Sequence, residues 1–308
     1  MKVDVIKHDR IKHDFIEREE HDINRSGIYR ARLADGRWHF QHGLIDLIIT
    51  LDGPPDVSQR GIDAAWRSFQ GVLLELCAEL TLLRADGIPA SRFVSPIAQR
   101  MADACWPFHE RFGLFVTPMA AVAGSVAEEI LKHLVLPGIK RASVNNGGDI
   151  ALYVAADQHF DIGVVSEFKT HGPAALPALA ATVRIDHDSG VRGIATSGWR
   201  GRSLSMGIAD AVTVLARTAA AADSAATLIA NAVNVEHPGI VRLPADQVRD
   251  DSDLQSRLVT CSVCALPGAS IDAALDKGAA FAERALDAGL IESAFLVLQG
   301  STRAVRAH

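Results

Sequence analysis

The sequence has few aromatic residues and no apolar run long enough to cross a membrane. Phe, Trp and Tyr together make up 6% of the 308 residues, so the core must be built from packed aliphatic side chains. The longest apolar stretches are interrupted by Gly, Asp or Arg before they reach the roughly 20 residues that a bilayer span requires. The first 20 residues are charged and lack the apolar centre of a signal peptide. These absences predict a cytoplasmic protein with no membrane partner.

Clusters of Lys and Arg are missing as well. The chain has 31 Lys and Arg against 37 Asp and Glu, which gives a formal net charge of −6. A protein that binds nucleic acid needs basic side chains along a groove to neutralise the phosphates. We therefore expect no nucleic-acid partner, although a single bound nucleotide would need only a local site. The oligomeric state stays open at this stage.

Cysteine is rare, with four residues in the chain. Cys77 and Cys105 fall within helical patterns and are expected to be buried thiols. Cys261 and Cys264 form one C-x-x-C motif on a segment that alternates like a strand. A zinc site would need a second cysteine pair or histidines at ligand spacing, and the sequence offers neither. We expect a structural role for this motif, with redox chemistry or metal binding as the alternatives.

The segments that are present predict short strands in hairpins, with long helices between them. The Asp35-Gly36 pair between two alternating runs is a strong hairpin signal, and apolar residues at spacings of three and four predict a long helix over about 62–83. Further helices are expected over about 97–105, 117–134, 219–233 and 271–288. Further strands are expected over about 44–51, 142–144, 150–155, 160–165, 181–185, 210–214, 258–266 and 294–298.

This order of elements predicts an α+β fold with antiparallel sheets and long packed helices, rather than a doubly wound parallel sheet. We expect a polar N-terminal tail or edge segment over residues 1–26 and a single domain over residues 27–308. Hairpin strands and a long helix occur in each half of that domain, which points to two pseudo-repeated halves.

Three segments carry the residues that chemistry would need. In the first, Asn146 is followed by Gly147, Gly148 and Asp149. Two glycines permit positive φ and a close approach of backbone to a ligand, and a carboxylate follows at the start of the next strand. The alternative is an ordinary tight turn between two strands.

The second segment contains Thr196, Ser197 and Gly198. Small residues leave room for a ligand, and the hydroxyl and amide groups can donate hydrogen bonds to it. Arg200 and Arg202 come directly after and could hold a phosphate group. A strand that ends in a turn is the alternative.

The third segment is an alanine-rich helix with Asp223 and Thr227 four residues apart, so both lie on one helix face. A carboxylate and a hydroxyl supply the oxygen ligands that a hard cation such as Mg²⁺ prefers. The alternative is that Asp223 caps its own helix and that Thr227 bonds back to a carbonyl of the same helix.

In this order, the G-G-D-I, A-T-S-G and A-D-x-x-A-T segments resemble the ApbE-like superfamily over about residues 30–300. The resemblance implies an ApbE-like, T-fold-like duplicated architecture, FAD as the bound flavin nucleotide and Mg²⁺ as the metal. It assigns the metal to Asp223 and Thr227, and cofactor contacts to the first two segments and Arg200. Members of the superfamily transfer FMN to a threonine of an acceptor protein or hydrolyse FAD.

The chain departs from the transferases of that family at the H-x-x-D-P motif. If Asp210 takes the place of the aspartate, Gly207 stands at the histidine position. The chain therefore resembles a branch that lacks this motif. Asp210 is the first candidate for the catalytic base, and His42, which can titrate near neutral pH, is the second.

Two kinds of function stay open at this stage. One is a flavin-binding protein with Mg²⁺-dependent FMN transferase or FAD pyrophosphatase activity. The other is a non-catalytic flavin or nucleotide carrier, or a structural pathway protein that has lost transferase chemistry.

Overall fold

The chain builds a large sheet from short strands that pair mostly with their sequence neighbours. The computed structural model describes residues 4–5, 21–23, 27–167 and 178–307. Its strands are Asp4–Val5 (β1), His21–Ile23 (β2), Tyr29–Arg32 (β3), Trp38–His42 (β4), Ile45–Asp52 (β5), Arg141–Asn146 (β6), Asp149–Val154 (β7), His159–Glu167 (β8), Ala178–Asp186 (β9), Gly193–Ser197 (β10), Ala211–Ala216 (β11), Ile240–Pro244 (β12), Leu258–Val263 (β13), Ser293–Leu298 (β14) and Ser301–Arg306 (β15).

Helices occupy the longer connections between these strands. They are Pro55–Ala78 (α1), Leu80–Leu83 (α2), Pro96–Phe112 (α3), Val122–Leu134 (α4), Ala219–Ala232 (α5), Ala245–Val248 (α6) and Gly268–Asp287 (α7), with 3₁₀ turns at Ala90–Arg92 (η2) and Pro118–Ala121 (η3). In the part of the chain that the structure describes, no helix combines the length and the apolar character needed to cross a membrane.

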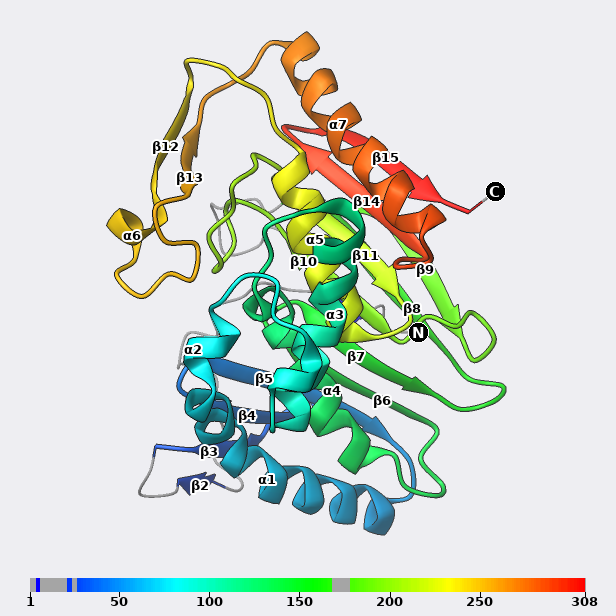
Figure 1. Cartoon of the computed structure of the whole chain (residues 1–308). Coiled ribbons are helices and arrows are strands. Elements are labelled where there is room, and N and C mark those ends of the chain that lie inside the picture. Colours follow the sequence, from blue (N-terminus) through cyan, green and yellow to red (C-terminus); the bar gives the residue numbers. More distant parts are fainter. Residues whose placement is uncertain (1–3, 6–20, 24–26, 168–177, 308) are drawn as a thin grey trace.

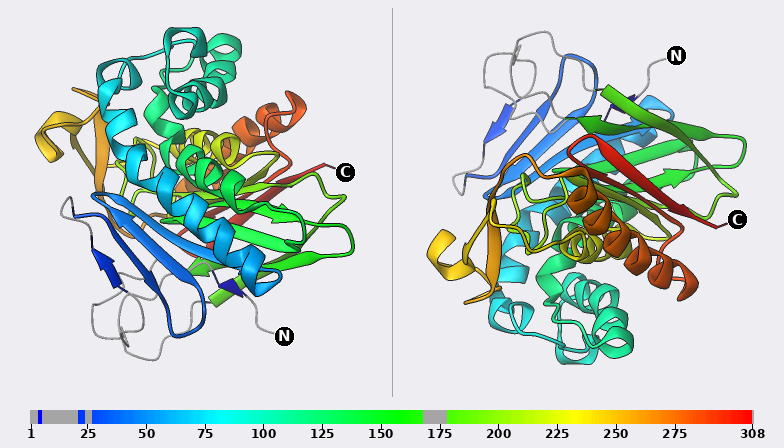
Figure 2. Two further views of the ribbon diagram at one scale, coloured as in Figure 1. Left: turned by 90° about the horizontal axis from the view of Figure 1, so that it is seen from below. Right: turned by 90° about the horizontal axis from the view of Figure 1, so that it is seen from above.

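The main sheet has ten strands in the order β15-β14-β11-β10-β7-β6-β5-β4-β3-β2, and every neighbouring pair is antiparallel. Helices α1, α4, α5 and α7 cover one face (Figure 1). The smaller sheet β1-β8-β9 shares a second apolar cluster with the other face of β7 and β10. Figure 2 shows this layering from two further sides. The expected α+β fold with antiparallel sheets is confirmed.

Alternation along the strands explains the two faces. In β5, Ile45, Leu47 and Ile49 are buried on the helix side, while the residues between them are half-buried. On that side, the alanine-rich α5 lies very close to α4, since a Cβ built on Gly124 would be 2.2 Å from the carbonyl oxygen of Ala219. Small residues at this contact bring two helices together near the start of α4 and of α5.

Four strand connections gather at one end of the sheet. The β4–β5 turn, the β6–β7 turn and the β14–β15 turn lie there, together with the end of β10 and the start of β11, as the strand registers require. We call this the turn end of the sheet. It brings residues 42, 146–149, 197–210 and 299 to one edge although they are far apart in the sequence.

Several predicted elements need correction. The helix expected over 62–83 begins at Pro55 and is divided at Glu79 into α1 and α2. Cys105 is buried as expected, but Cys77 is exposed, so that prediction is wrong. Its neighbour Leu76 belongs to the buried stripe of α1, and one residue along a helix turns the next side chain away by about 100°.

The N-terminal segment is described only in part. Within residues 1–26, the strands β1 and β2 are defined, and residues 1–3, 6–20 and 24–26 lie outside the described part of the chain. The short β2 adds an edge strand to the main sheet next to β3. The proposed division into a tail and one domain with two pseudo-repeated halves stays a prediction.

Candidate functional site

The turn between β6 and β7 holds the first predicted segment. Gly147 and Gly148 have φ values of +68° and +117°, which residues with a Cβ rarely adopt. Asn145 fixes the turn, because its Oδ1 accepts a hydrogen bond of 2.8 Å from the amide of Gly148. Asn146 is buried and donates its side-chain amide to the carbonyl of Ala123 at 3.2 Å. The turn is thereby tied to the start of α4.

Two carboxyl groups from opposite halves of the chain meet beside this turn. Asp149 begins β7 and is half-buried, while Asp223 on α5 is 9% exposed. Burial raises the pKa of Asp149 to about 7, against lowering by a main-chain hydrogen bond from Thr196 and by the charge of Arg202. Burial, and after it the nearby charge of Asp149, raises the pKa of Asp223 well above its usual range. The surroundings therefore disfavour the charged form of both carboxyl groups.

Asp223 lies in the interior of α5 and not at its cap. Thr218 is the N-cap, with its side chain accepting from the amide of Ala221. The Oδ2 atom of Asp223 instead accepts a hydrogen bond of 2.9 Å from the amide of Gly124, in the first turn of α4. The alternative in which Asp223 caps its own helix is therefore wrong.

Thr227 follows Asp223 by about one turn of α5 and is half-buried. Within the described residues, its hydroxyl has no hydrogen-bond partner, and so it does not bond back to its own helix. Ser224, on the same helix, shows the contrasting case, because its hydroxyl donates to the carbonyls of Ala104 and Ala221. Thr227 therefore keeps a free oxygen on the same helix as the Asp223 carboxylate.

The T-S-G segment ends β10 beside the turn. The hydroxyl of Thr196 lies 2.9 Å from that of Thr213 on β11, and Ser197 is half-buried. Gly198 lies against the backbone, since a Cβ there would be 2.4 Å from the carbonyl oxygen of Asp210. The main-chain link from Thr196 to Asp149 joins this segment to the carboxylate pair.

Asp210 has its hydrogen-bonding capacity largely used by its neighbours. Its Oδ1 accepts from Trp199 Nε1 at 3.2 Å and from Arg200 Nε at 3.1 Å, and its Oδ2 accepts from the main-chain amide of Gln299 at 2.6 Å. The guanidinium of Arg200 also stacks on the ring of Trp199 at 4.5 Å. Through these contacts Asp210 holds the loop after β10 against the β14–β15 turn.

His42 ends β4 at the same end of the sheet. Its ring meets Phe69 of α1 edge-on, with 6.4 Å between the ring centres. The Nδ1 atom is buried and has no hydrogen-bond partner among the described residues. Of the two predicted bases, Asp210 is held on both oxygens, whereas His42 has a buried ring nitrogen with no partner among the described residues.

Sequence patterns single out neither Asp46 nor the placement of Arg202 at this site. Asp46 on β5 holds His39 Nε2 at 2.8 Å, and its main-chain amide donates to Asn146 Oδ1 at 3.5 Å. Arg202 lies over Gly147, and its charge acts on both Asp46 and Asp149. These contacts join segments far apart in the chain, so no local spacing could have predicted them.

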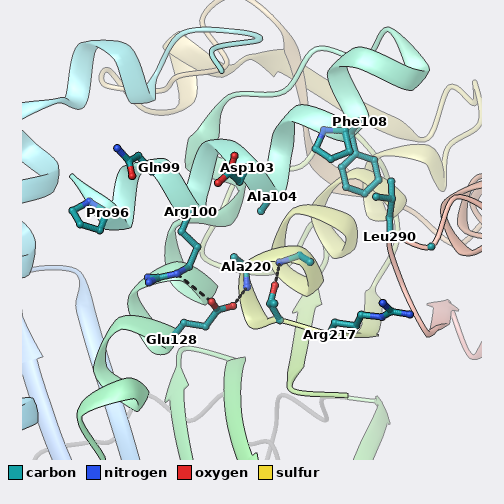
Figure 3. A pocket seen from close by; sticks show the side chains of 14 residues that line it. Pro96, Gln99, Arg100, Asp103, Ala104, Phe108, Glu128, Arg217, Ala220 and Leu290 are labelled. Atoms are coloured by element: carbon teal, nitrogen blue, oxygen red, sulfur yellow. Dashed lines mark hydrogen bonds and ion pairs between the residues drawn. The ribbon is translucent and has the colours of Figure 1, made fainter. Parts of the chain in front are cut away.

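An open pocket of about 450 Å³ lies elsewhere, near the opposite end of β11. Figure 3 shows its wall, in which Arg100 meets Glu128 and the amide of Ala220 donates to Glu128. None of the predicted site residues lines it. Arg100 and Glu128 pair with each other there, and Glu128 also accepts from the start of α5, so we assign this pair a structural role.

The arrangement at the turn end can bind a cation through oxygen atoms. Asp149 and Asp223 supply two carboxylates that repel each other, and Thr227 adds a hydroxyl. The described residues contain no cluster of three or more His, Cys, Asp and Glu side chains that could hold a metal. A cation here would therefore have to complete its shell with other oxygen atoms, such as those of water or of a phosphate group.

Comparison with known proteins places these residues in a family context. A family model described as AbpE bacteria matches residues 30–304. The UPF0280 protein of Methanothrix thermoacetophila is 35% identical over 173 residues, which cover 56% of this chain and 66% of that protein. The UPF0280 protein of Methanothermobacter thermautotrophicus is 40% identical over 121 residues, which cover 39% of this chain and 43% of that protein. The chain thus aligns with less than two thirds of these relatives' lengths.

A solved structure shares a remote likeness along most of the chain. The apo form of the Pseudomonas stutzeri flavinyl transferase ApbE is 13% identical, with a TM-score of 0.41. The match covers 94% of this chain and 96% of that chain.

Proposed function

Because the chain belongs to the family described as AbpE bacteria, we propose that it binds a flavin nucleotide, FAD, at the turn end of the sheet with the help of Mg²⁺. The family match confirms the ApbE-like superfamily that the motifs predicted. One observation carries the proposal. The half-buried Asp149 and the buried Asp223 form a pair of neighbouring carboxyl groups directly beside the β6–β7 glycine turn.

The residues present fit a divalent cation. Two carboxylates whose pKa values are raised by burial would both ionise if a cation shared their charge. The free hydroxyl of Thr227 adds a third oxygen, and Mg²⁺ ordinarily keeps several waters or phosphate oxygens in addition. When bound, the metal would neutralise phosphate charge and polarise a phosphoryl oxygen.

The protein's own groups would orient the nucleotide around this centre. The carboxylate of Asp223 is fixed by the amide of Gly124, and Asp149 is fixed by the main-chain link to Thr196. Gly147 and Gly148 form the turn beside this centre, with the Arg202 guanidinium over Gly147, and Gly198 packs against the backbone of Asp210. Asn146 and Ser197 complete the wall, and Arg200 and Asp210 hold the loop beside it.

Catalysis by this site would need a base that can accept a proton from an incoming threonine or water. His42 is the better placed of the two candidates, because its Nδ1 has no partner within the described part of the chain. We therefore assign FMN transfer to an acceptor protein, or FAD hydrolysis, to a site that uses His42 as base and Asp210 as a positioning residue.

A second candidate function is non-catalytic flavin binding, and one observation favours it. If Asp210 takes the place of the family's aspartate, Gly207 is at the position of the transferases' histidine, and a Cβ on Gly207 would be 2.0 Å from the carbonyl oxygen of Ala230. The backbone of α5 therefore fills the space of any side chain at this position. A histidine side chain at this position would clash with the backbone of α5, whereas the Asp149–Asp223 pair is present.

A binding and turnover experiment tests the proposal. The protein, treated with EDTA, is titrated with FAD with and without added Mg²⁺, while FAD fluorescence is followed and AMP and FMN are measured by chromatography. Mg²⁺ should strengthen FAD binding, and Asp223→Asn should reduce that gain by at least about tenfold, because it removes a charged metal ligand.

Asp276→Asn serves as the matched control, because Asp276 is exposed and its ion pair among the described residues is with Arg303. Asp276→Asn should change neither the affinity for FAD nor its increase with Mg²⁺. Absence of FAD binding by the wild-type protein in either condition would refute the proposal. FAD binding without AMP or FMN release would exclude FAD hydrolysis by the protein alone.

A further inference from the structure

Arg202 lies directly on the glycine turn. A Cβ built on Gly147 would be 1.7 Å from Arg202 Nη2, so the guanidinium occupies the space that a side chain would take. Its Nη1 reaches the carbonyl of Leu44, in the β4–β5 turn, at 3.5 Å. Arg202 therefore bridges two turns at the turn end of the sheet, beside the carboxylate pair.

The guanidinium of Arg202 keeps most of its donors unused. The residue is exposed, and among the described residues its side chain makes one hydrogen bond, at the upper limit of distance. A guanidinium has five N–H donors in a fixed plane, which match the oxygens of a carboxylate or phosphate. Arg184, by contrast, uses two of its nitrogens to donate hydrogen bonds to the carboxylate of Asp161, at 2.9 Å and 3.4 Å.

The charge of Arg202 acts on two carboxylates that it does not bind. It contributes to lowering the pKa of Asp46, after the hydrogen bond from His39, and it opposes the burial that raises the pKa of Asp149. Asp46 already has His39 as its partner at 2.8 Å. The cation is thus held near the metal-binding carboxylates by long-range attraction, while its donor atoms stay available for an anion.

The backbone of Arg202 is anchored from a different part of the chain. Arg249, which follows α6, donates from Nη2 to the Arg202 carbonyl at 3.0 Å. Nearby, the amide of Thr260 on β13 donates to the carbonyl of Ser205 at 2.8 Å. The hairpin β12–β13 and its helix α6 therefore fix the loop that carries Arg202, so the guanidinium is preorganised over the turn.

We propose that Arg202 is the phosphate-recognition residue of this site, and that it makes the site selective for phosphorylated flavins over riboflavin. The inference rests on the proposed function, because it concerns the same flavin site. A phosphate placed at the glycine turn would accept hydrogen bonds from two N–H groups of Arg202, and a cation held by Asp149, Asp223 and Thr227 would neutralise further phosphate charge. Riboflavin has no phosphate and would gain nothing from either.

Three ligands separate this role from a merely structural one. The affinities of the wild-type protein and of Arg202→Gln for FAD, FMN and riboflavin are measured by fluorescence titration in the presence of Mg²⁺. Arg202→Gln should weaken FAD and FMN binding by about 10- to 100-fold, the range of a charge-assisted bidentate contact, and leave riboflavin binding unchanged. Arg202→Lys keeps the positive charge but lacks the planar guanidinium. Its affinity for FAD and FMN should lie between those of the wild-type protein and Arg202→Gln.

Arg184→Gln is the matched control, because it removes an exposed arginine that is paired elsewhere. It should not change any of the three affinities. An equal loss for riboflavin and FAD, or no loss for FAD, in an Arg202→Gln protein with wild-type thermal unfolding would overturn the inference and leave the flavin site standing. A wild-type protein that binds none of the three ligands would instead refute the proposed function, and the inference with it.

Discussion

At the scale of single residues, Gly147 has two separate reasons to lack a side chain. Its φ of +68° is costly for any residue with a Cβ, and the space beside it belongs to Arg202. At Gly190 only the first reason applies, because its φ is +70° but no atom lies within 4 Å of a built Cβ. Alanine at either position meets the same backbone strain, but only at Gly147 would it push the guanidinium away.

We therefore expect Gly147→Ala and Gly190→Ala each to lower the free energy of unfolding by about 1 kcal/mol, since both force alanine into positive φ. Only Gly147→Ala should also weaken FAD binding. Urea denaturation and FAD titration of both variants provide the two measurements. Equal FAD affinity of the two variants would show that the contact with Arg202 does not matter for the ligand.

At this scale the sequence predicts which two side chains share a helix face, but not what they contact. The Asp223 and Thr227 spacing predicted a shared helix face, and α5 has it. The meeting of Asp223 with Asp149, and the use of Gly124 as a donor to Asp223, depend on how two distant helices pack on a sheet. Local spacing contains no information on such contacts, so the pair could not have been derived before the fold was known.

At the scale of elements, the helix that carries Asp223 is stabilised at its start by a neighbouring helix. The amide of Ala220, in the first turn of α5, donates to Glu128 Oε1 of α4 at 2.8 Å, and Arg100 of α3 lies 3.2 Å from Oε2 of the same carboxylate (Figure 3). Burial raises the pKa of Glu128, against the lowering effect of these donors. The Glu128 carboxyl group thus serves mainly as the hydrogen-bond acceptor for the amide of Ala220 in the first turn of α5.

Glu128→Ala should lower the free energy of unfolding by about 1–2 kcal/mol, because it leaves the first turn of α5 without its acceptor. Glu128→Gln retains an acceptor oxygen and should lose less than half as much. Chemical denaturation followed by circular dichroism measures both. Equal losses for the two variants would mean that the charge, and not the hydrogen bond to Ala220, is what counts.

Long, periodic elements were predictable and short or non-sequential ones were not. The periodicity of α1, α4, α5 and α7 reflects one buried face, which a sequence displays directly. Strands β12 and β15 lack a clear alternation of apolar residues, and the pairing of β10 with β7 joins strands that are not neighbours in the chain. Tertiary packing decides these features, so the turn end of the sheet appears only in the folded molecule.

At the scale of the whole molecule, the buried carboxylate pair ties global stability to pH. Asp149 has a pKa of about 7 in the folded protein, well above the ordinary range of an aspartate near 4. Between these two values the folded state binds more protons than the unfolded state, so the free energy of unfolding falls as pH rises from about 4 to about 7, and this contribution is constant above. At neutral pH the charged Asp149 therefore lowers the free energy of unfolding of the metal-free protein.

Asp149→Asn removes this ionisation and should stabilise the metal-free protein at pH 8 relative to wild type, by on the order of 2 kcal/mol, with little difference near pH 4. Urea denaturation in EDTA at both pH values measures the difference between the two proteins. Asp161→Asn is the control, because the Arg184 side chain lowers the pKa of Asp161 and the substitution should bring no gain at pH 8. A wild-type protein as stable as Asp149→Asn at pH 8 would show that the pair is already neutralised by the fold, and would remove the physical reason for placing a cation between Asp149 and Asp223.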